Sequence, residues 1–290
     1  MNGLLVVNKE KDCTSRDVVN SVSKILGTKK VGHTGTLDPM ATGVLVMCIG
    51  KCTKLVDMIT CDEKEYVAGV KLGILTDTLD TTGNVLKSES VNFSRDEIVN
   101  VLKSMTGEYE QEVPIYSAVK INGKKLYEYA RNGEKVELPK RMVNIKEIEL
   151  ISDIEYSNKT INFNIKCLVS KGTYIRSLVR DIAKKLGTIG VMSSLKRTKQ
   201  GKFTIEESYT LSNIEKGNYK IIDIGTYFKD MYKVIVDDKL KKEILNGKLL
   251  DNTYKYDKIL FVDKNNNVLA IYSIYEKDNK KIKPYKMLGV

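Results

Sequence analysis

The chain has 290 residues, with 48 Lys and Arg against 37 Asp and Glu, so its formal net charge is +11 at pH 7. An apolar content of 42% is enough for a sizeable core, and the length exceeds one average domain, so we expect one large domain and one small one. The charge favours a polyanionic partner. A general bias towards lysine would explain the same charge, since only seven of the 48 basic residues are arginine.

The cysteines are odd in number, and no secretory leader opens the sequence. We therefore expect a reduced, cytoplasmic protein. The longest apolar stretches, such as residues 44–49, are far shorter than the roughly 20 residues that a membrane helix needs, so no membrane span is expected. The cysteines are Cys13, Cys48, Cys52, Cys61 and Cys167.

The predicted elements begin with a short apolar strand over residues 3–8. A helix follows, with Ser15 as its candidate N-cap and Gly27 just past its end. A capping box of Ser94 and Glu97 predicts a second helix, with Gly107 as its left-handed stop. Apolar residues recur at helical spacing in both, namely Val18, Val19, Val22, Ile25 and Leu26, then Ile98, Val101, Leu102 and Met105.

Apolar and polar residues alternate over positions 161–167, which predicts a half-buried strand that runs towards Lys171 and Gly172. A third helix is expected after it, with Thr173 as its N-cap and Gly187 as its terminator. Its buried stripe is Ile175, Leu178, Val179, Ile182 and Leu186. Because strands and helices are interspersed, the pattern favours a mixed α/β fold over an all-parallel sheet.

Beyond Phe228 the sequence changes to short predicted strands over residues 258–262 and 268–274, with a polar turn between them. We place a boundary near residue 229. Residues 1–228 are then the large domain, and residues 229–290 form a small β-rich domain.

The segment from Val31 to Leu45 reads VGHTGTLDPMATGVL and precedes a predicted buried strand. Its glycines permit a tight backbone path close to a ligand, and Pro39 restricts Asp38 to extended or turn geometry, which fixes where the carboxylate points. An ordinary Asp-Pro turn would explain Asp38 and Pro39 taken alone. The segment also holds the only histidine of the chain.

This segment resembles the signature of the TruB family, the tRNA pseudouridine-55 synthases. Four further segments, in the order expected for that family, resemble its other motifs: KEYVAGVKLGILTDTLDTTG (64–83), PIYSAVKINGKKLYEYARNG (114–133), KGTYIRSLVRDIAKKLG (171–187) and LKRTKQGKF (195–203). Five ordered motifs are far more specific than one, and the resemblance covers roughly residues 3–225. The family usually has Lys-Pro after its first strand, whereas this chain has Lys9, Glu10 and Lys11.

The resemblance implies a pseudouridine-synthase fold of the α/β class (α+β type), with a central mixed, largely antiparallel sheet flanked by helices. It implies an RNA-gripping insertion at about residues 108–142 and a PUA-like, RNA-binding domain at residues 229–290. It further implies a monomer that isomerises uridine 55 in the T stem-loop of tRNA without a guide RNA or a cofactor.

Residue by residue, the resemblance makes Asp38 the catalytic aspartate and Arg176 the arginine paired with it. It places the ring of Tyr66 against the target uracil. Substrate contacts are implied for His33, Tyr174 and Leu195, although plain core packing would explain Leu195 nearly as well.

An isomerisation that consumes no water needs only one carboxylate, in contrast to the pair that a glycosidase uses. Asp38 would attack the base, attack the sugar or take a proton from the ribose, and these routes stay open. Arg176 would keep Asp38 ionised, because an opposite charge within about 4 to 6 Å favours the carboxylate. A cation in the first turn of a helix opposes the helix dipole, so other groups are expected to hold Arg176 there.

No metal site is expected, because Cys48 and Cys52 lack a second pair at zinc-finger spacing. Buried free thiols are expected instead. Residues 77–83 lack the alternating ligands of a calcium loop, and no phosphate-binding glycine loop occurs.

Two alternative functions fit parts of this sequence. A guide-RNA-dependent relative would share the Asp38 motif, but residues 124–131 resemble the stand-alone enzymes. A non-catalytic RNA-binding protein would need no set of Asp38, Tyr66 and Arg176.

Overall fold

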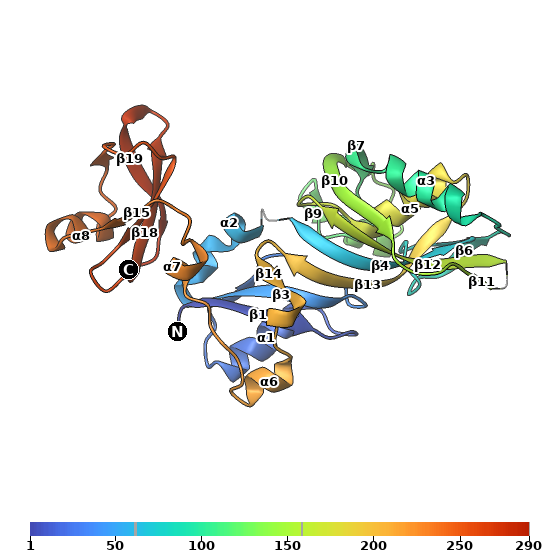
Figure 1. The fold of residues 1–290 in the computed structure, drawn as a ribbon, viewed down its shortest axis with the longest axis horizontal. Coiled ribbons are helices and arrows are strands. Elements are labelled where there is room, and N and C mark those ends of the chain that lie inside the picture. The colour runs from blue at the N-terminus through green and yellow to red at the C-terminus, as the bar shows by residue number, and fades with distance from the viewer. Residues whose placement is uncertain (61–62, 158, 290) are drawn as a thin grey trace.

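The computed structural model describes residues 1–60, 63–157 and 159–289, so Cys61 lies outside the described residues. A large sheet occupies the centre and right of Figure 1, and a smaller sheet, in red, lies at the left. The fold is therefore mixed α/β with a small C-terminal β unit, as the sequence predicts.

Ten strands make up the large sheet. Its main path runs β1 (Gly3–Lys9), β3 (Thr42–Ile49), β13 (Gly190–Gln200), β4 (Lys64–Leu72), β12 (Thr160–Val169), β10 (Lys140–Leu150) and β7 (Gly107–Glu112). Beside this path, β2 (Val31–His33) pairs with β3, β14 (Phe203–Thr204) with β13, and β11 (Glu155–Ser157) with β12. Among the described strands of this sheet, only β3 and β13 pair in parallel, which confirms the expected mixed, largely antiparallel sheet.

Side chains of the large sheet alternate between two cores, as the period of two in a strand requires. Leu5 and Val7 of β1 face a core that the predicted helices cover, α1 (Ser15–Ile25), α3 (Arg95–Ser104) and α5 (Ile175–Lys185). Leu4 and Val6 face the opposite side and pack in a second core with residues of the C-terminal sheet. The N-terminal part of the large sheet is thus buried on both faces.

The predicted helices exist, but two of their caps differ from the prediction. Thr14, not Ser15, caps α1 in a capping box with Asp17, because the Ser15 hydroxyl is instead hydrogen-bonded to the backbone of Leu37. Tyr174, not Thr173, occupies the N-cap position of α5, because the Thr173 hydroxyl donates back to the Ser170 carbonyl.

The ends of the helices agree better with the prediction. The capping box of Ser94 and Glu97 at α3 is confirmed. Gly27 and Gly187, with φ of +61° and +77°, each follow the C-cap of their helix as predicted. Gly107 has a positive φ but does not end α3, because the C-cap is Met105 and Gly107 already begins β7.

The C-terminal sheet has five strands in the order β15-β17-β18-β19-β16. The predicted strands over 258–262 and 268–274 are confirmed as β17 and β18. The elements of this unit are β15 (Lys233–Ile235), α8 (Asp238–Leu245), β16 (Leu250–Asp251), β17 (Lys258–Val262), β18 (Val268–Tyr275) and β19 (Asp278–Met287).

Short elements connect the strands of the large sheet. The segment between β7 and β10 holds a two-stranded hairpin and one short helix. The short elements are the 3-10 helix η1 (Gly50–Leu55), α2 (Val56–Thr60), β5 (Ile74–Thr76), β6 (Val85–Ser88), β8 (Lys120–Ile121), β9 (Lys124–Lys125), α4 (Leu126–Arg131), η2 (Ile205–Glu207), α6 (Leu211–Glu215) and α7 (Ile224–Tyr227).

The described cysteines are free, and three of them, Cys48, Cys52 and Cys167, are buried. Burial raises the pKa of the Cys48 thiol to about 12 and that of Cys52 to about 11, which makes them unreactive core residues. Within the described ranges, no group of three His, Cys, Asp or Glu side chains could hold a metal ion. No helix in the same ranges is long and apolar enough to cross a membrane.

Candidate active site

Asp38 lies in the loop that joins β2 to β3, at the centre of the glycine-rich segment. Pro39 follows it, and the Ala41 backbone N–H donates to the Asp38 carbonyl at 3.0 Å, which closes a tight turn. The Ser15 hydroxyl fixes the start of this turn, since it accepts from the Leu37 N–H at 2.9 Å and donates to the Leu37 carbonyl at 3.1 Å. The Asp38 carboxylate remains 33% exposed, so a substrate can reach it.

Lys9, to which the sequence assigns no role, is hydrogen-bonded to the part of this turn that follows Asp38. Its side chain is fully buried, and its ammonium donates to the carbonyls of Pro39 at 3.1 Å and Ala41 at 2.6 Å. Burial lowers the pKa of Lys9, while the charges of Cys13 and Asp38 oppose that shift. The last residue of β1 thus fixes the backbone that follows the candidate catalytic residue.

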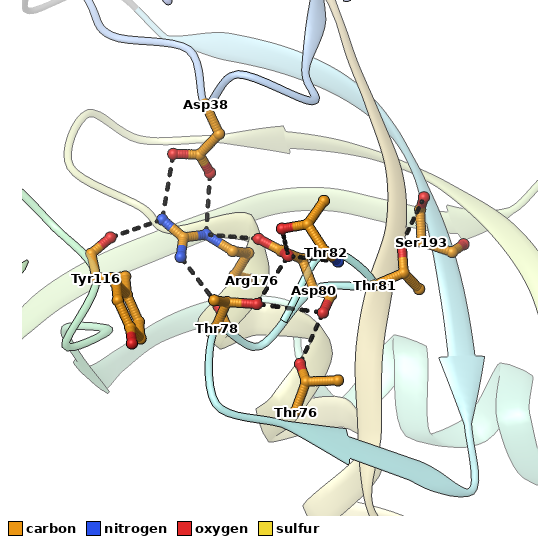
Figure 2. Close-up of polar contacts among 9 residues, drawn as sticks. All are labelled: Asp38, Thr76, Thr78, Asp80, Thr81, Thr82, Tyr116, Arg176 and Ser193. Atoms are coloured by element: carbon orange, nitrogen blue, oxygen red, sulfur yellow. Dashed lines mark hydrogen bonds and ion pairs between the residues drawn. The ribbon is translucent and has the colours of Figure 1, made fainter. Parts of the chain in front are cut away.

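Two nitrogens of Arg176 contact the Asp38 carboxylate (Figure 2). The distance from Nε to Oδ2 is 2.9 Å, and that from Nη2 to Oδ1 is 3.2 Å. The other N–H groups donate to the carbonyls of Thr78 at 3.0 Å and Tyr116 at 2.9 Å. These partners explain how a buried cation stays in the first turn of α5 against the helix dipole.

Asp80 is a second carboxylate beside Arg176, and it was not predicted from the sequence. It is buried, and its Oδ2 lies 3.9 Å from Arg176 Nε. Its Oδ1 accepts from the hydroxyls of Thr78 and Thr82 and from the Thr82 N–H. The threonine-rich run from Thr76 to Gly83 was the available signal, because hydroxyl-bearing residues at this density can hold a buried carboxylate (Figure 2).

Tyr66 extends from β4 and is 6% exposed. Its hydroxyl accepts from Arg197 Nη1 at 3.4 Å. The same buried guanidinium donates to the carbonyls of Val44 at 2.7 Å and Gly35 at 3.0 Å, so it connects Tyr66 to the glycine-rich segment. Arg197 was missed because an arginine within a basic run is normally solvated.

The three predicted substrate contacts lie on separate elements. Leu195 is on β13, Tyr174 is the N-cap residue of α5, and His33 is on β2. Leu195 of β13 is 8% exposed and shares a core with Tyr66. The Tyr174 ring lies beneath the guanidinium of Arg141, with 5.5 Å between Arg141 Cζ and the ring centroid.

His33 ends β2, and its Nδ1 accepts from the Gly35 N–H at 3.3 Å. Burial and the nearby positive charge of Arg197 lower the pKa of His33. The structure therefore brings Asp38 and Arg176 into direct contact, links Tyr66 and His33 to the same loop, and leaves Leu195 in the core.

Two solved structures share this fold. One, described as "Structure of H/ACA RNP bound to a substrate RNA containing 2'-deoxyuridine", aligns with 99% of this chain and 84% of its own, at a TM-score of 0.67 and 23% identity. The other, "Crystal Structure of a Cbf5-Nop10-Gar1 Complex", aligns with 93% of this chain and 78% of its own, at a TM-score of 0.66 and 25% identity. These likenesses establish the fold of the chain.

The family follows from the sequence comparisons. The TruB family pseudouridylate synthase N-terminal domain matches residues 23–175, and the tRNA pseudouridylate synthase B C-terminal domain matches residues 176–230. The tRNA pseudouridine synthases B of Staphylococcus aureus strains MRSA252 and Newman are 44% identical over 99% of this chain and 99% of their own. The chain belongs to the TruB family, whose members isomerise uridine to pseudouridine in tRNA.

Proposed function

We propose that this enzyme isomerises uridine 55 in the T loop of tRNA as a stand-alone protein, with Asp38 as its catalytic carboxylate. The observation that carries the proposal is the two-nitrogen contact of Arg176 with the partly exposed Asp38 carboxylate. Relatives named tRNA pseudouridine synthase B, at 44% identity over the full length, support the substrate.

The reaction breaks the N1–C1′ glycosidic bond, turns the base, and joins C5 to the same C1′. C5 loses its proton and N1 gains one, so no water, metal or redox partner enters the balance. Asp38 supplies a negative charge beside the reacting base, by attack on the base or the sugar or as a base towards the ribose. Arg176 holds that carboxylate in one orientation, which a reaction with a single carboxylate requires.

The target uridine must leave its stack to expose the glycosidic bond. We propose that the Tyr66 ring stacks on the extruded uracil, and that Tyr174 and Leu195 line the same pocket. Aromatic stacking recovers about 1 to 3 kcal/mol per base. His33, beside glycines that allow close approach, would contact the RNA backbone.

We propose that residues 1–228 are the catalytic domain and that residues 229–290 are a PUA-like RNA-binding domain. Within the catalytic domain, the insertion at about residues 108–142 would grip the RNA. Cations over aromatic rings support the gripping role: Lys124 lies over the Tyr129 ring, and Arg131 lies over the Tyr127 ring. We further propose that the enzyme is a cytoplasmic monomer and needs no guide RNA.

The test is to incubate the purified protein with unmodified tRNA transcript alone and to map pseudouridine in the product. Conversion at position 55 without any other component is expected, in the presence or absence of a chelator. A requirement for an added RNA would refute the stand-alone function, and conversion at another position would refute the proposed site.

A further inference from the structure

The N-terminus of α5 carries Tyr174 and Arg176 but lacks a side-chain cap of its own. Tyr174 occupies the N-cap position and its side chain forms no capping hydrogen bond. In a capping box, the third helical residue would reach back to the N-cap N–H. Here that residue is Ser177, whose short side chain instead donates to the Glu112 carbonyl at 2.8 Å.

Gln111 of β7 supplies the missing hydrogen bond from another element. Its side chain is fully buried, and its Oε1 accepts from the Tyr174 backbone N–H at 2.8 Å. Its Nε2 donates to the Tyr109 hydroxyl at 2.7 Å. That hydroxyl donates in turn to Asp181 Oδ2 at 3.3 Å, about two turns along the same helix. Because a backbone N–H only donates, Tyr174 fixes which end of the Gln111 amide faces it.

The pair of Arg176 and Asp38 depends on where this first turn lies. Arg176 is the second residue of α5, so a shift of the Tyr174 backbone moves the Cα that carries the guanidinium. The guanidinium is aligned simultaneously with Asp38, the Thr78 carbonyl and the Tyr116 carbonyl, and a small displacement cannot keep all of these bonds. A helix N-terminus also repels the cation, so the turn needs external support.

We propose that Gln111 is a positioning residue for the isomerisation. Its amide fixes the position of the first turn of α5 and thereby the contact of Arg176 with Asp38. This inference rests on the proposed roles of Asp38 and Arg176. It assigns no contact with the RNA to Gln111.

The decisive variant is Gln111→Met, which keeps the length of the side chain but removes the acceptor. The single-turnover rate of pseudouridine formation should fall about tenfold, while the Kd for tRNA stays within twofold of wild type. Ser177→Ala is the matched control, because it removes another hydrogen bond between the same strand and the same helix without touching Tyr174. It should keep the rate within twofold.

Gln111→Glu retains an acceptor for the Tyr174 N–H and should recover most of the lost rate. Three outcomes would each overturn the inference. One is a wild-type rate in Gln111→Met, and another is equal rates in Gln111→Met and Gln111→Glu. The third is a loss of rate in Ser177→Ala as large as that in Gln111→Met. If Gln111→Met does not fold, Tyr109→Phe decides, because it removes the hydroxyl that accepts from Nε2 and holds the other end of the amide in place. A wild-type rate there would also refute the role. Wild-type conversion of uridine 55 in the same assay confirms the proposed function independently.

Discussion

At the scale of single residues, the Asp38 carboxylate is bound on both oxygens by the guanidinium of Arg176. Asp38→Asn keeps the size of the side chain but places an amide donor against a group that only donates. We expect pseudouridine formation to be abolished while tRNA binding persists, since contacts to phosphates dominate affinity. Single-turnover assays and equilibrium binding measure both. Appreciable turnover in this variant would exclude Asp38 as the catalytic carboxylate.

Arg176→Lys keeps the charge but loses the planar fork. An ammonium on a flexible chain cannot satisfy Asp38 on both oxygens together with the carbonyls of Thr78 and Tyr116. The single-turnover rate should fall by about 10²-fold, the effect expected when a reacting group is misplaced by about 1 Å. A near-normal rate would show that charge alone suffices and that the two-nitrogen geometry is irrelevant.

Lys9→Met removes the buried ammonium that holds the carbonyls of Pro39 and Ala41. The Ala41 oxygen would lose its donor in a buried place, which costs about 1 to 3 kcal/mol, whereas the Pro39 oxygen keeps the Asp12 N–H. Urea denaturation should show a loss of this size together with reduced turnover. Lys11→Met, at an exposed position two residues later, is the control and should change neither quantity.

Among elements, the parallel contact between β3 and β13 leaves no room for a side chain at Gly43. Gly43 of β3 has a φ of +101°, and a Cβ there would lie 2.2 Å from the Arg197 carbonyl. Gly43→Ala therefore forces the strands apart at the residue that holds Tyr66 and the Gly35 loop.

We expect Gly43→Ala to destabilise the fold by roughly 2 to 4 kcal/mol, the sum of backbone strain and overpacking. Gly217→Ala isolates the strain, because Gly217 also has a positive φ but has open space around it. Equal losses of stability in the two variants would argue against the steric clash.

Local patterns predicted the helices and strands, because apolar spacing and the glycines after α1 and α5 act within one element. The caps of α1 and α5 were wrong by one residue. At α1, adjacent hydroxyl residues look alike in sequence, and the contact of Ser15 with Leu37 leaves Thr14 to cap. At α5, the Thr173 hydroxyl donates to the Ser170 carbonyl instead, and the N-cap residue Tyr174 forms no side-chain cap.

In the site, the motif resemblance supplied Asp38, Arg176 and Tyr66. Buried polar residues were missed, namely Lys9, Asp80, Gln111 and Arg197. Lys9, Gln111 and Arg197 each bind backbone groups on other elements, and a sequence without a fold does not reveal such partners. A lysine or arginine is ordinarily a surface residue, so its type gave no warning of burial.

On the scale of the whole molecule, the two sheets share one apolar core. Leu260, Val262 and Ile271 of the C-terminal sheet pack in the same cluster as Leu4 and Val44 of the large sheet. Removal of residues 229–290 would expose the back of β1 and β3. We therefore expect the truncated chain to aggregate or unfold, although Asp38 and Arg176 are retained.

Calorimetry of the intact protein should accordingly show one cooperative transition rather than two. Leu260→Ala should lower its midpoint, since a buried leucine contributes about 2 to 5 kcal/mol. Two separate transitions, with only the weaker one sensitive to Leu260, would contradict the shared core.

The outer edge of β1 is covered by chain that lies about two hundred positions later. Backbone hydrogen bonds join Leu4 to Ile222 and Asn8 to Tyr209. On a ribosome that adds about 5 to 20 residues per second, this edge stays unpaired for roughly 10 to 40 seconds and is open to wrong partners in that time. The strand that bears Lys9 is therefore paired along this edge only after the ribosome has passed Tyr209 and Ile222.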